Sequence, residues 1–213
     1  MHYRTIRSEG VGAARHLPPV YMPKISLSQV ILCEGKYDVV RLSSLFDALI
    51  LPTHGFQVYN DAQRRGLLRR LAAQRGLIIV TDSDHAGFQI RGYLKSFIPA
   101  GQLKHVYIPD IMGKESRKAQ ASSEGKLGVE GIETQALLDA FQRAGLLGEQ
   151  ESPPKALCKI MLYRDGFSGT PGCKERYRRL LKALDLPEHL SVNHFCACVS
   201  EEEYEKAKEQ LCA

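Results

Sequence analysis

The chain has 213 residues, of which 44% are hydrophobic and 25% are charged, and its formal net charge is +5. These values are ordinary for a globular protein that buries one core, or one core and a small second unit. No apolar run reaches the roughly 18 to 20 residues of a membrane span. The polar, basic start also lacks the apolar centre of a secretory signal. We therefore expect a cytoplasmic protein that makes no membrane contact, and its charge favours a polyanionic partner.

The first part of the chain shows no clean periodicity, and residues 1–26 are predicted to form an irregular arm. Short apolar runs then alternate with segments of helical periodicity. Strands are predicted over residues 29–33, 48–51, 77–80 and 105–108, and helices over residues 37–46, 61–75, 86–97 and 134–144. Strands that are apolar throughout and alternate with helices are typical of a parallel sheet covered on both faces. The predicted fold class is therefore α/β over residues 27–148.

The rest of the chain is predicted to be helical. Residues 113–128 are polar and rich in small residues, which indicates a loop, and residues 149–154 indicate a linker. Three further helices are predicted: residues 155–163, a helix that begins near Pro171, and a last helix opened by a capping box of Ser200 and Glu203. Residues 149–213 are thus predicted to form a small all-helical domain. The six cysteines form no C-x-x-C pair, so we expect reduced, structural thiols rather than a zinc site.

Three acidic residues follow two of the predicted strands. Glu34 comes directly after the first strand, and Asp82 and Asp84 come after the third. Parallel α/β sheets bind ligands outside the carboxyl ends of their strands, where loops could bring these carboxylates together. Crowded like charges are unfavourable without a cation, and hard oxygen ligands suit Mg²⁺ or Mn²⁺. The sequence therefore predicts a metal site, although either aspartate could simply cap the next helix.

Other residues beside these acids are candidates for supporting roles. Gly35 is expected to let the chain turn, and Gly87 to allow a tight start of the next helix. Lys36 could bind phosphate or be a solvated lysine, and His54 could contact the substrate. Asp38 could position Lys36 or a metal-bound water, or could only favour the helix N-terminus.

Two segments carry a resemblance to a known family. Residues 30–38 (VILCEGKYD) and 78–87 (IIVTDSDHAG) resemble the Toprim domain, with its glutamate-glycine turn after the first strand and its D-x-D after the third. The resemblance covers about residues 27–110. It implies a Toprim-like parallel sheet flanked by helices, with Glu34, Asp82 and Asp84 as the catalytic residues.

A narrower resemblance joins the chain to the ribonuclease M5 group, which matures 5S ribosomal RNA. It rests on residues 126–130 (KLGVE), on the T-D-S-D form and on Ile90 with Arg91, whereas the arm and residues 194–198 depart from the group. The resemblance implies a magnesium-dependent endoribonuclease that hydrolyses phosphodiester bonds in structured precursor RNA. A ribosomal protein would shape that RNA first.

The same resemblance implies a role for each acid. Glu34 would be the general acid or base, and Asp82 and Asp84 would hold Mg²⁺, or Mn²⁺ in its place. The number of ions, one or two, is left open, because Glu34 could bridge to a second ion. Glu130 would support the site or cap the helix at Thr134.

Basic residues gather in three segments. They are Arg64, Arg65, Arg69 and Arg70 on one helix, Lys114, Arg117, Lys118 and Lys126 on a loop, and Lys174, Arg178 and Arg179 in the helical domain. A solvated face is the ordinary explanation of such clusters, and contact with an RNA backbone is the alternative. Tyr163, Phe167 and Tyr177 could stack on bases or form the core of the helical domain.

Two other functions remain open at this point. One is a Toprim-family DNA nuclease or a primase-like enzyme, although the chain has no zinc-binding module. The other is a non-catalytic nucleic-acid-binding module, which would have no reason to keep three crowded acids. A phosphohydrolase of small substrates would need a phosphate cradle such as G-x-x-x-x-G-K-[ST], and the sequence has none.

Overall fold

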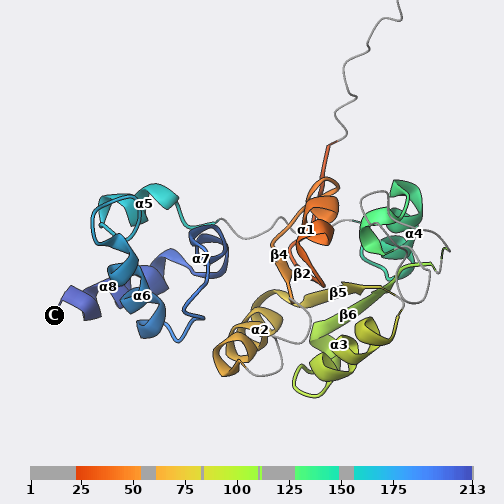
Figure 1. The fold of residues 1–213 in the computed structure, drawn as a ribbon, viewed down its shortest axis with the longest axis horizontal. Helices are drawn as coiled ribbons and strands as arrows, with labels where there is room; N and C mark the ends of the chain where they lie inside the picture. The colour runs from red at the N-terminus through yellow and green to blue at the C-terminus, as the bar shows by residue number, and fades with distance from the viewer. Residues whose placement is uncertain are drawn as a thin grey trace, which may run out of the picture.

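The computed structural model describes residues 23–53, 61–82, 84–109, 111, 128–148 and 156–212. The strands are β1 (Ile25–Ser26), β2 (Val30–Cys33), β3 (Phe46–Asp47), β4 (Ile50–Pro52), β5 (Leu77–Thr81) and β6 (Leu103–Tyr107). The first four helices are α1 (Lys36–Ser43), α2 (Ala62–Arg75), α3 (His85–Lys95) and α4 (Thr134–Arg143), with short 3₁₀ turns η2 (Ala100–Gln102) and η3 (Val129–Gly131). The C-terminal helices are α5 (Lys159–Arg164), α6 (Cys173–Ala183), α7 (Val192–Cys198) and α8 (Glu201–Cys212) (Figure 1).

The main sheet has the strand order β4-β2-β5-β6, and every pairing in it is parallel. Strands β2 and β5 are neighbours at its centre, with Leu32 opposite Ile79. Because the two strands run in the same direction, their carboxyl ends meet at one edge of the sheet. The acidic residues of the two sequence motifs directly follow β2 and β5 at this edge.

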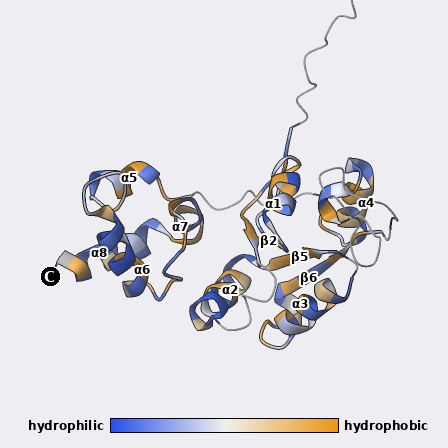
Figure 2. Cartoon of the chain, in the orientation of Figure 1, coloured by the Kyte–Doolittle hydropathy of each residue, from blue (hydrophilic) through white to orange (hydrophobic). Residues whose placement is uncertain are grey.

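The sheet is covered on both faces, because alternate residues of each strand point to opposite sides. Val30 and Leu32 of β2 join a hydrophobic cluster with α2 and α3, whereas Ile31 and Cys33 join a second cluster with α1 and α4. Figure 1 shows these two pairs of helices on opposite sides of the strands, and β5 is hydrophobic between them (Figure 2). The predicted α/β class with a parallel sheet flanked by helices is confirmed, and the arrangement is consistent with a Toprim-like fold.

The predicted arm ends earlier than expected. Residues 25–26 form β1, which pairs in parallel with β3, and Leu27 is completely buried. A two-residue strand is held by backbone hydrogen bonds to a distant segment, so periodicity could not reveal it. Residues 1–22 lie outside the described part of the chain.

Helices α5 to α8 are all in the C-terminal part, where sequence periodicity indicated helices. Their buried side chains include Leu162, Leu180, Phe195 and Tyr204, and this core is continuous with the cluster on the α2 side of the sheet. The capping box at the start of α8 is confirmed, since the backbone N–H of Ser200 donates to Glu203 and the N–H of Glu203 donates to the Ser200 hydroxyl. Within the described residues, no helix is long and apolar enough to cross a membrane.

Two details of the helical part differ from prediction. Helix α6 begins at Cys173 rather than near Pro171, because Gly172 has a φ of 71° and breaks the helical path before it. Helix α7 was not predicted at all. It is short, and its first turn is stabilised by Ser191, whose hydroxyl accepts from the N–H of His194.

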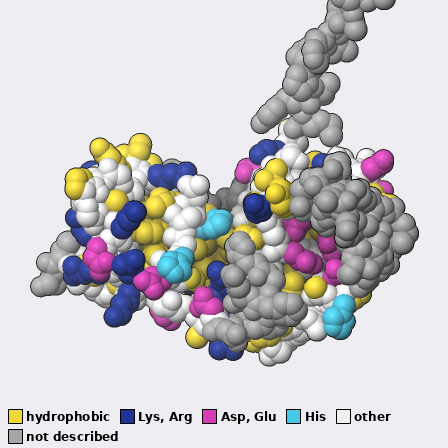
Figure 3. Space-filling view, viewed as in Figure 1, with side chains coloured by type: hydrophobic (Ala, Val, Ile, Leu, Met, Phe, Trp, Pro, Cys, Tyr) yellow, Lys and Arg dark blue, Asp and Glu magenta, His cyan; other side chains and the backbone are white. Residues whose placement is uncertain are grey.

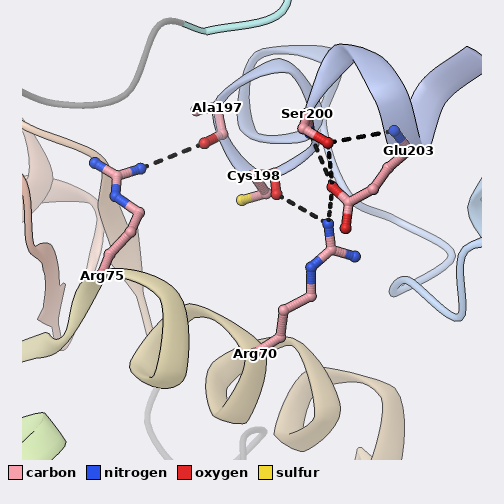
Figure 4. Close-up of polar contacts among 6 residues, drawn as sticks. All are labelled: Arg70, Arg75, Ala197, Cys198, Ser200 and Glu203. Carbon is pink, nitrogen blue, oxygen red and sulfur yellow. Dashed lines mark hydrogen bonds and ion pairs between the residues drawn. The ribbon is translucent and has the colours of Figure 1, made fainter.

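Two arginines of α2 connect the α/β part to the C-terminal helices (Figure 4). Arg70 Nη2 donates to Glu203 Oε2 over 2.6 Å and to the carbonyl of Cys198 over 3.2 Å. Arg75 donates to the carbonyl of Ala197 over 3.4 Å. These contacts stabilise the position of α7 and α8 against α2.

Candidate metal and catalytic site at the sheet edge

The structure brings Glu34 and Asp82 together at the carboxyl edge of the sheet. Glu34 directly follows β2, and Asp82 directly follows Thr81, the last residue of β5. The backbone N–H of Asp82 donates to Glu34 Oε1 over 3.1 Å. This bond joins the ends of the two central strands, so the two motifs form one site.

The carboxylates of Asp82 and Asp84 have different local roles. Asp84 is the N-cap of α3, and its Oδ1 accepts from the N–H of Gly87 over 2.8 Å, so the capping role that the sequence allowed is present. Asp82 Oδ1 instead accepts from the N–H of Val129 over 2.8 Å. The three acids are therefore each oriented by a backbone N–H.

The electrostatics of the site disfavour full ionisation. Burial, together with the negative charges of Asp82 and Asp84, raises the pKa of Glu34 to about 7. Burial also raises the pKa of Asp38 to about 6, and the charges of Asp82 and Glu130 act in the same direction. A cation at this edge would relieve the repulsion, because it favours the ionised form of each carboxyl group.

Close backbone contact explains two glycines of the site. A Cβ on Gly128 would lie 2.5 Å from Asp82 Oδ2, and a Cβ on Gly87 would collide with the carbonyl of Asp82. The tight start of α3 expected at Gly87 is thus confirmed. Gly35 is different, because its φ of −142° is open to any residue and nothing lies within 4 Å of its Cβ position. The chain bends at Gly35 as expected, but these backbone angles do not require glycine.

Asp38 and Glu130 are far apart in sequence but lie on two elements, α1 and η3, that contact each other. Asp38 is 9% exposed, and its Oδ2 accepts from the N–H of Gly35 over 3.0 Å, which is the helix N-terminal role that the sequence left open. Glu130 lies in η3, which contacts α1, and it acts electrostatically on Asp38. The residue at the N-cap position of α4 is Glu133. Lys36 is the exposed first residue of α1.

A buried arginine, Arg91, supports the site and was absent from the predicted set. Its side chain is 4% exposed and donates to the carbonyl of Val106 over 2.6 Å and to the hydroxyl of Thr81 over 3.0 Å. It therefore ties the ends of β5 and β6 together, and it also interacts electrostatically with Glu34. Its place on the buried face of α3, one residue after Ile90, was a signal in the sequence, since a charge there requires partners.

The donors at this edge fit a hard divalent cation in chemistry, because all are carboxylate oxygens. Gly128 also leaves room beside Asp82 that a Cβ would fill. Among the described residues, however, no group of three or more His, Cys, Asp or Glu side chains is arranged so that it could hold a metal ion. The described part of this edge therefore offers carboxylate oxygens but no closed cage for an ion.

The predicted RNA-contacting residues have different surroundings. Arg70 is bonded to Glu203, Arg178 is paired with Glu175 and Glu188, and the Arg69 guanidinium lies over the ring of Phe97. The side chains of Lys174 and Arg179 are exposed, and those of Arg64 and Arg65 are partly buried. The candidates outside the described residues are His54, Lys114, Arg117, Lys118 and Lys126.

The aromatic candidates of the helical part divide in the same way. Phe167 is buried, and the hydroxyl of Tyr177 donates to the carbonyl of Leu190, so both belong to the core. Tyr163 is 60% exposed and is the one of the three that could meet a base. The cysteines with described side chains, at positions 33, 158, 173, 196 and 198, are all free, and Cys33, Cys196 and Cys198 are buried.

Comparison with known proteins identifies the relatives of this chain, although no family model matches it. The ribonuclease M5 of Lactiplantibacillus plantarum is 29% identical over 161 residues, which cover 75% of this chain and 80% of that protein. The ribonuclease M5 of Clostridium botulinum is 25% identical over 87% of this chain and 97% of its own length, and that of Bacillus subtilis is 26% identical over 73% and 77%. The chain is therefore similar to proteins named ribonuclease M5 over most of its length.

Proposed function

We propose that this chain is an endoribonuclease that matures ribosomal RNA, with precursor 5S rRNA as its substrate. Its similarity to proteins named ribonuclease M5 supports the class of reaction. The observation that carries the proposal is the junction of Glu34 and Asp82, which brings two separate acidic motifs into one site at the edge of the sheet.

The proposed cofactor is Mg²⁺, or Mn²⁺ in its place, held by Asp82 and Asp84, with Glu34 bridging if two ions bind. Mg²⁺ usually binds through one or two carboxylates, several waters and the phosphates of its substrate. An open set of carboxylates is consistent with this mode of binding. When bound, the ion would polarise a phosphoryl oxygen and neutralise the charge that develops on it.

The side chains around the ion would divide the remaining work. Glu34 would hold or accept the proton of the attacking or leaving oxygen, because it lies between the two strand ends where the phosphate is expected. The N–H of Val129 keeps Asp82 oriented before the substrate arrives. Lys36, exposed at the start of α1, would contact a phosphate next to the cut.

The C-terminal helices would recognise the RNA. We propose residues 149–213 as an RNA-recognition unit, with the exposed side chains of Lys174 and Arg179 contacting phosphates and Tyr163 contacting a base. The bonds of Arg70 and Arg75 to α7 and α8 would keep this unit in place beside the sheet. A ribosomal protein that shapes the precursor is proposed as a partner.

The direct test is incubation of the protein with precursor 5S rRNA, with Mg²⁺ and with a chelator, followed by mapping of the product ends. We expect Mg²⁺-dependent cuts, and their loss in Glu34→Gln and Asp82→Asn with RNA affinity retained. Glu209→Gln, which removes the same charge from the exposed face of α8, is the matched control.

Parallel reactions contain single-stranded and duplex DNA, and a further series adds ribosomal proteins that bind 5S rRNA. Cutting of DNA but not of RNA would replace the proposal with a DNA nuclease. RNA binding without any cut would indicate a non-catalytic module. Undiminished cutting by Glu34→Gln would remove the proposed chemistry.

A further inference from the structure

Aromatic side chains are exposed around the acidic edge of the sheet. In the part of the chain that the structure describes, four Phe or Tyr side chains are exposed, and three of them lie at this edge. Tyr37, in the first turn of α1, is 42% exposed, and Phe88, in the first turn of α3, is 55% exposed. Tyr107, the last residue of β6, is 50% exposed. The proposed chemistry gives none of these rings a role.

The helices that carry Tyr37 and Phe88 begin at the acidic edge but cover opposite faces of the sheet. The buried residues of α1 and of α3 belong to different hydrophobic clusters, one on each face. Helix α1 begins two residues after Glu34, and α3 begins directly after Asp84. Figure 3 shows acidic side chains at the surface between the positions that α1 and α3 have in Figure 1, with hydrophobic side chains on either side of them. The two first turns therefore lie on two sides of the acids.

The direction of Tyr37 follows from its place on α1. Residues four apart lie on the same side of a helix, so Tyr37 shares a side with Arg41. Arg41 donates to the carbonyl of Ile132, directly after η3, over 2.8 Å. Val129 of η3 is the residue whose N–H orients Asp82. Tyr37 therefore lies on the side of α1 that faces the segment holding Asp82.

Phe88 has the corresponding place on α3. It lies three residues before Arg91, so these two residues share a side of the helix. Arg91 donates to the hydroxyl of Thr81, the residue before Asp82, over 3.0 Å. The Arg91 guanidinium also lies 4.3 Å from the centre of the Tyr107 ring, so it covers one face of that ring. Phe88 is therefore the more accessible ring on this side of the sheet.

The chemistry of the two rings selects a flat and largely apolar ligand. Phe88 has no polar side-chain atom, so it holds a ligand only through its ring. The carboxylates between the two rings repel anions, so the phosphate itself is left to the cation. The ammonium group of Lys36 lies 5.0 Å from the centre of the Tyr37 ring and adds a positive charge there. A nucleobase stacks on such a ring, and its sugar-phosphate chain benefits from the lysine beside it.

We infer that Tyr37 and Phe88 stack on the two nucleobases that flank the cleaved bond, one base on each ring. The inference rests on the proposed function, in which the phosphate of that bond lies at Glu34 and Asp82. Bases that remain stacked on each other cannot reach rings on opposite faces of the sheet. The RNA strand is therefore splayed at the cut, and its two stacked bases hold the phosphate at the acids.

The test uses the full chain and precursor 5S rRNA in which the nucleotide on one side of the mapped cut, or on the other, is replaced by an abasic one. Phe88→Leu and Tyr37→Leu keep an apolar side chain but remove the ring, and each should lower kcat/KM on intact RNA about tenfold. Each Leu variant should lose nothing further on one of the two abasic RNAs, and the two variants should differ in which one that is. Phe88→Tyr and Tyr37→Phe, which keep the ring, should restore most of the lost kcat/KM.

The matched control is Val40→Ala, which shortens an exposed apolar side chain on α1 one turn beyond Tyr37. Thermal unfolding checks that each variant is folded. Equal cleavage by the wild type and a Leu variant would overturn the inference while the proposed function stands. Losses that add on both abasic RNAs would overturn it too, because the rings would then contact something other than these bases.

A second arm does not depend on cleavage. The wild type and the two Leu variants are titrated with an unstructured RNA oligonucleotide and with the same strand in base-free form. Stacking is a contact with bases rather than with phosphates, so the Leu variants should bind the oligonucleotide about tenfold more weakly but the base-free strand equally well. This result supports base stacking even if the wild type cuts no RNA and the proposed function fails. Equal affinity of all three proteins for the oligonucleotide would overturn the stacking in that event.

Discussion

Replacement of Glu34 by Gln should make the metal-free protein more stable at alkaline pH while it removes the proposed activity. The pKa of Glu34 rises from 4.5 to about 7 on folding, because the side chain is buried near Asp82 and Asp84. At pH 8 the folded chain therefore carries a carboxylate that would be more stable in water. Gln is neutral, and its amide oxygen can still accept the N–H of Asp82.

The magnitude follows from the pKa difference. A pKa difference of about 2.5, at about 1.4 kcal/mol for each pKa unit, sets an upper limit of about 3.5 kcal/mol on the gain in the free energy of unfolding. Solvent at this half-buried site reduces it, and we expect an increase of about 1–3 kcal/mol in the free energy of unfolding. The corresponding rise in Tm for a chain of this size is about 3–9 °C.

The pH dependence has a definite sign. The folded pKa of Glu34 lies above the unfolded one, so between about pH 4.5 and pH 7 the folded state binds more protons. This group therefore makes the wild type lose stability as the pH rises through that window. The gain in the free energy of unfolding that Glu34→Gln brings should be small near pH 4.5 and should reach its full value above pH 7.

The assay is urea unfolding at pH 5 and at pH 8 in the presence of a chelator, for the wild type, Glu34→Gln and the control Glu209→Gln. Added Mg²⁺ should stabilise the wild type at pH 8 more than it stabilises Glu34→Gln. A variant that is less stable than the wild type at pH 8, or a difference that does not change with pH, would refute the reasoning.

Three other predictions concern residues around the site. Gly128→Ala should reduce cleavage about 100-fold with little loss of stability. The new alanine Cβ would lie 2.5 Å from Asp82 Oδ2, so it must displace that carboxylate oxygen. The loss of cleavage is measured as kcat/KM, and the stability as Tm. Arg91→Met should lower the free energy of unfolding by about 2–4 kcal/mol, since the carbonyl of Val106 loses a buried donor, which urea titration would show. Arg70→Leu should cost only about 1 kcal/mol in global stability but should increase hydrogen exchange in α7 and α8, because it removes their ion pair with α2.

Each of these predictions has a control and a contrary outcome. Gly35→Ala is the control for Gly128→Ala, because nothing stands near its Cβ position; equal losses in both would show that the close contact is unimportant. If Arg91→Met is as stable as the wild type, the carbonyl groups that Arg91 binds must accept hydrogen bonds from water in the variant. Arg143→Gln is the control for Arg70→Leu, and exchange unchanged in α7 and α8 would show that apolar contacts alone hold them.

Much of the α/β part could be predicted, because local sequence dictates it. The apolar run of residues 77–80 became β5, and the segment 61–75 became α2 with Asp61 as its N-cap. The position of Glu34, Asp82 and Asp84 at one edge followed from parallel strands alone. The weakest predictions concerned short elements such as β1 and α7, whose stability comes from distant partners rather than from their own periodicity.

By itself, the sequence determined the fold class and the edge of the sheet that carries the acids, since hydrophobic periodicity and strand ends are local properties. Only the tertiary structure decided which groups orient those acids. The N–H of Val129 reaches Asp82 across 47 positions of sequence, and Arg91 is satisfied by carbonyls of two strands. Tyr37 and Phe88 likewise lie on two sides of the acids only because α1 and α3 pack on opposite faces of the sheet. Such contacts depend on the packing of distant segments, which no local pattern of residues encodes.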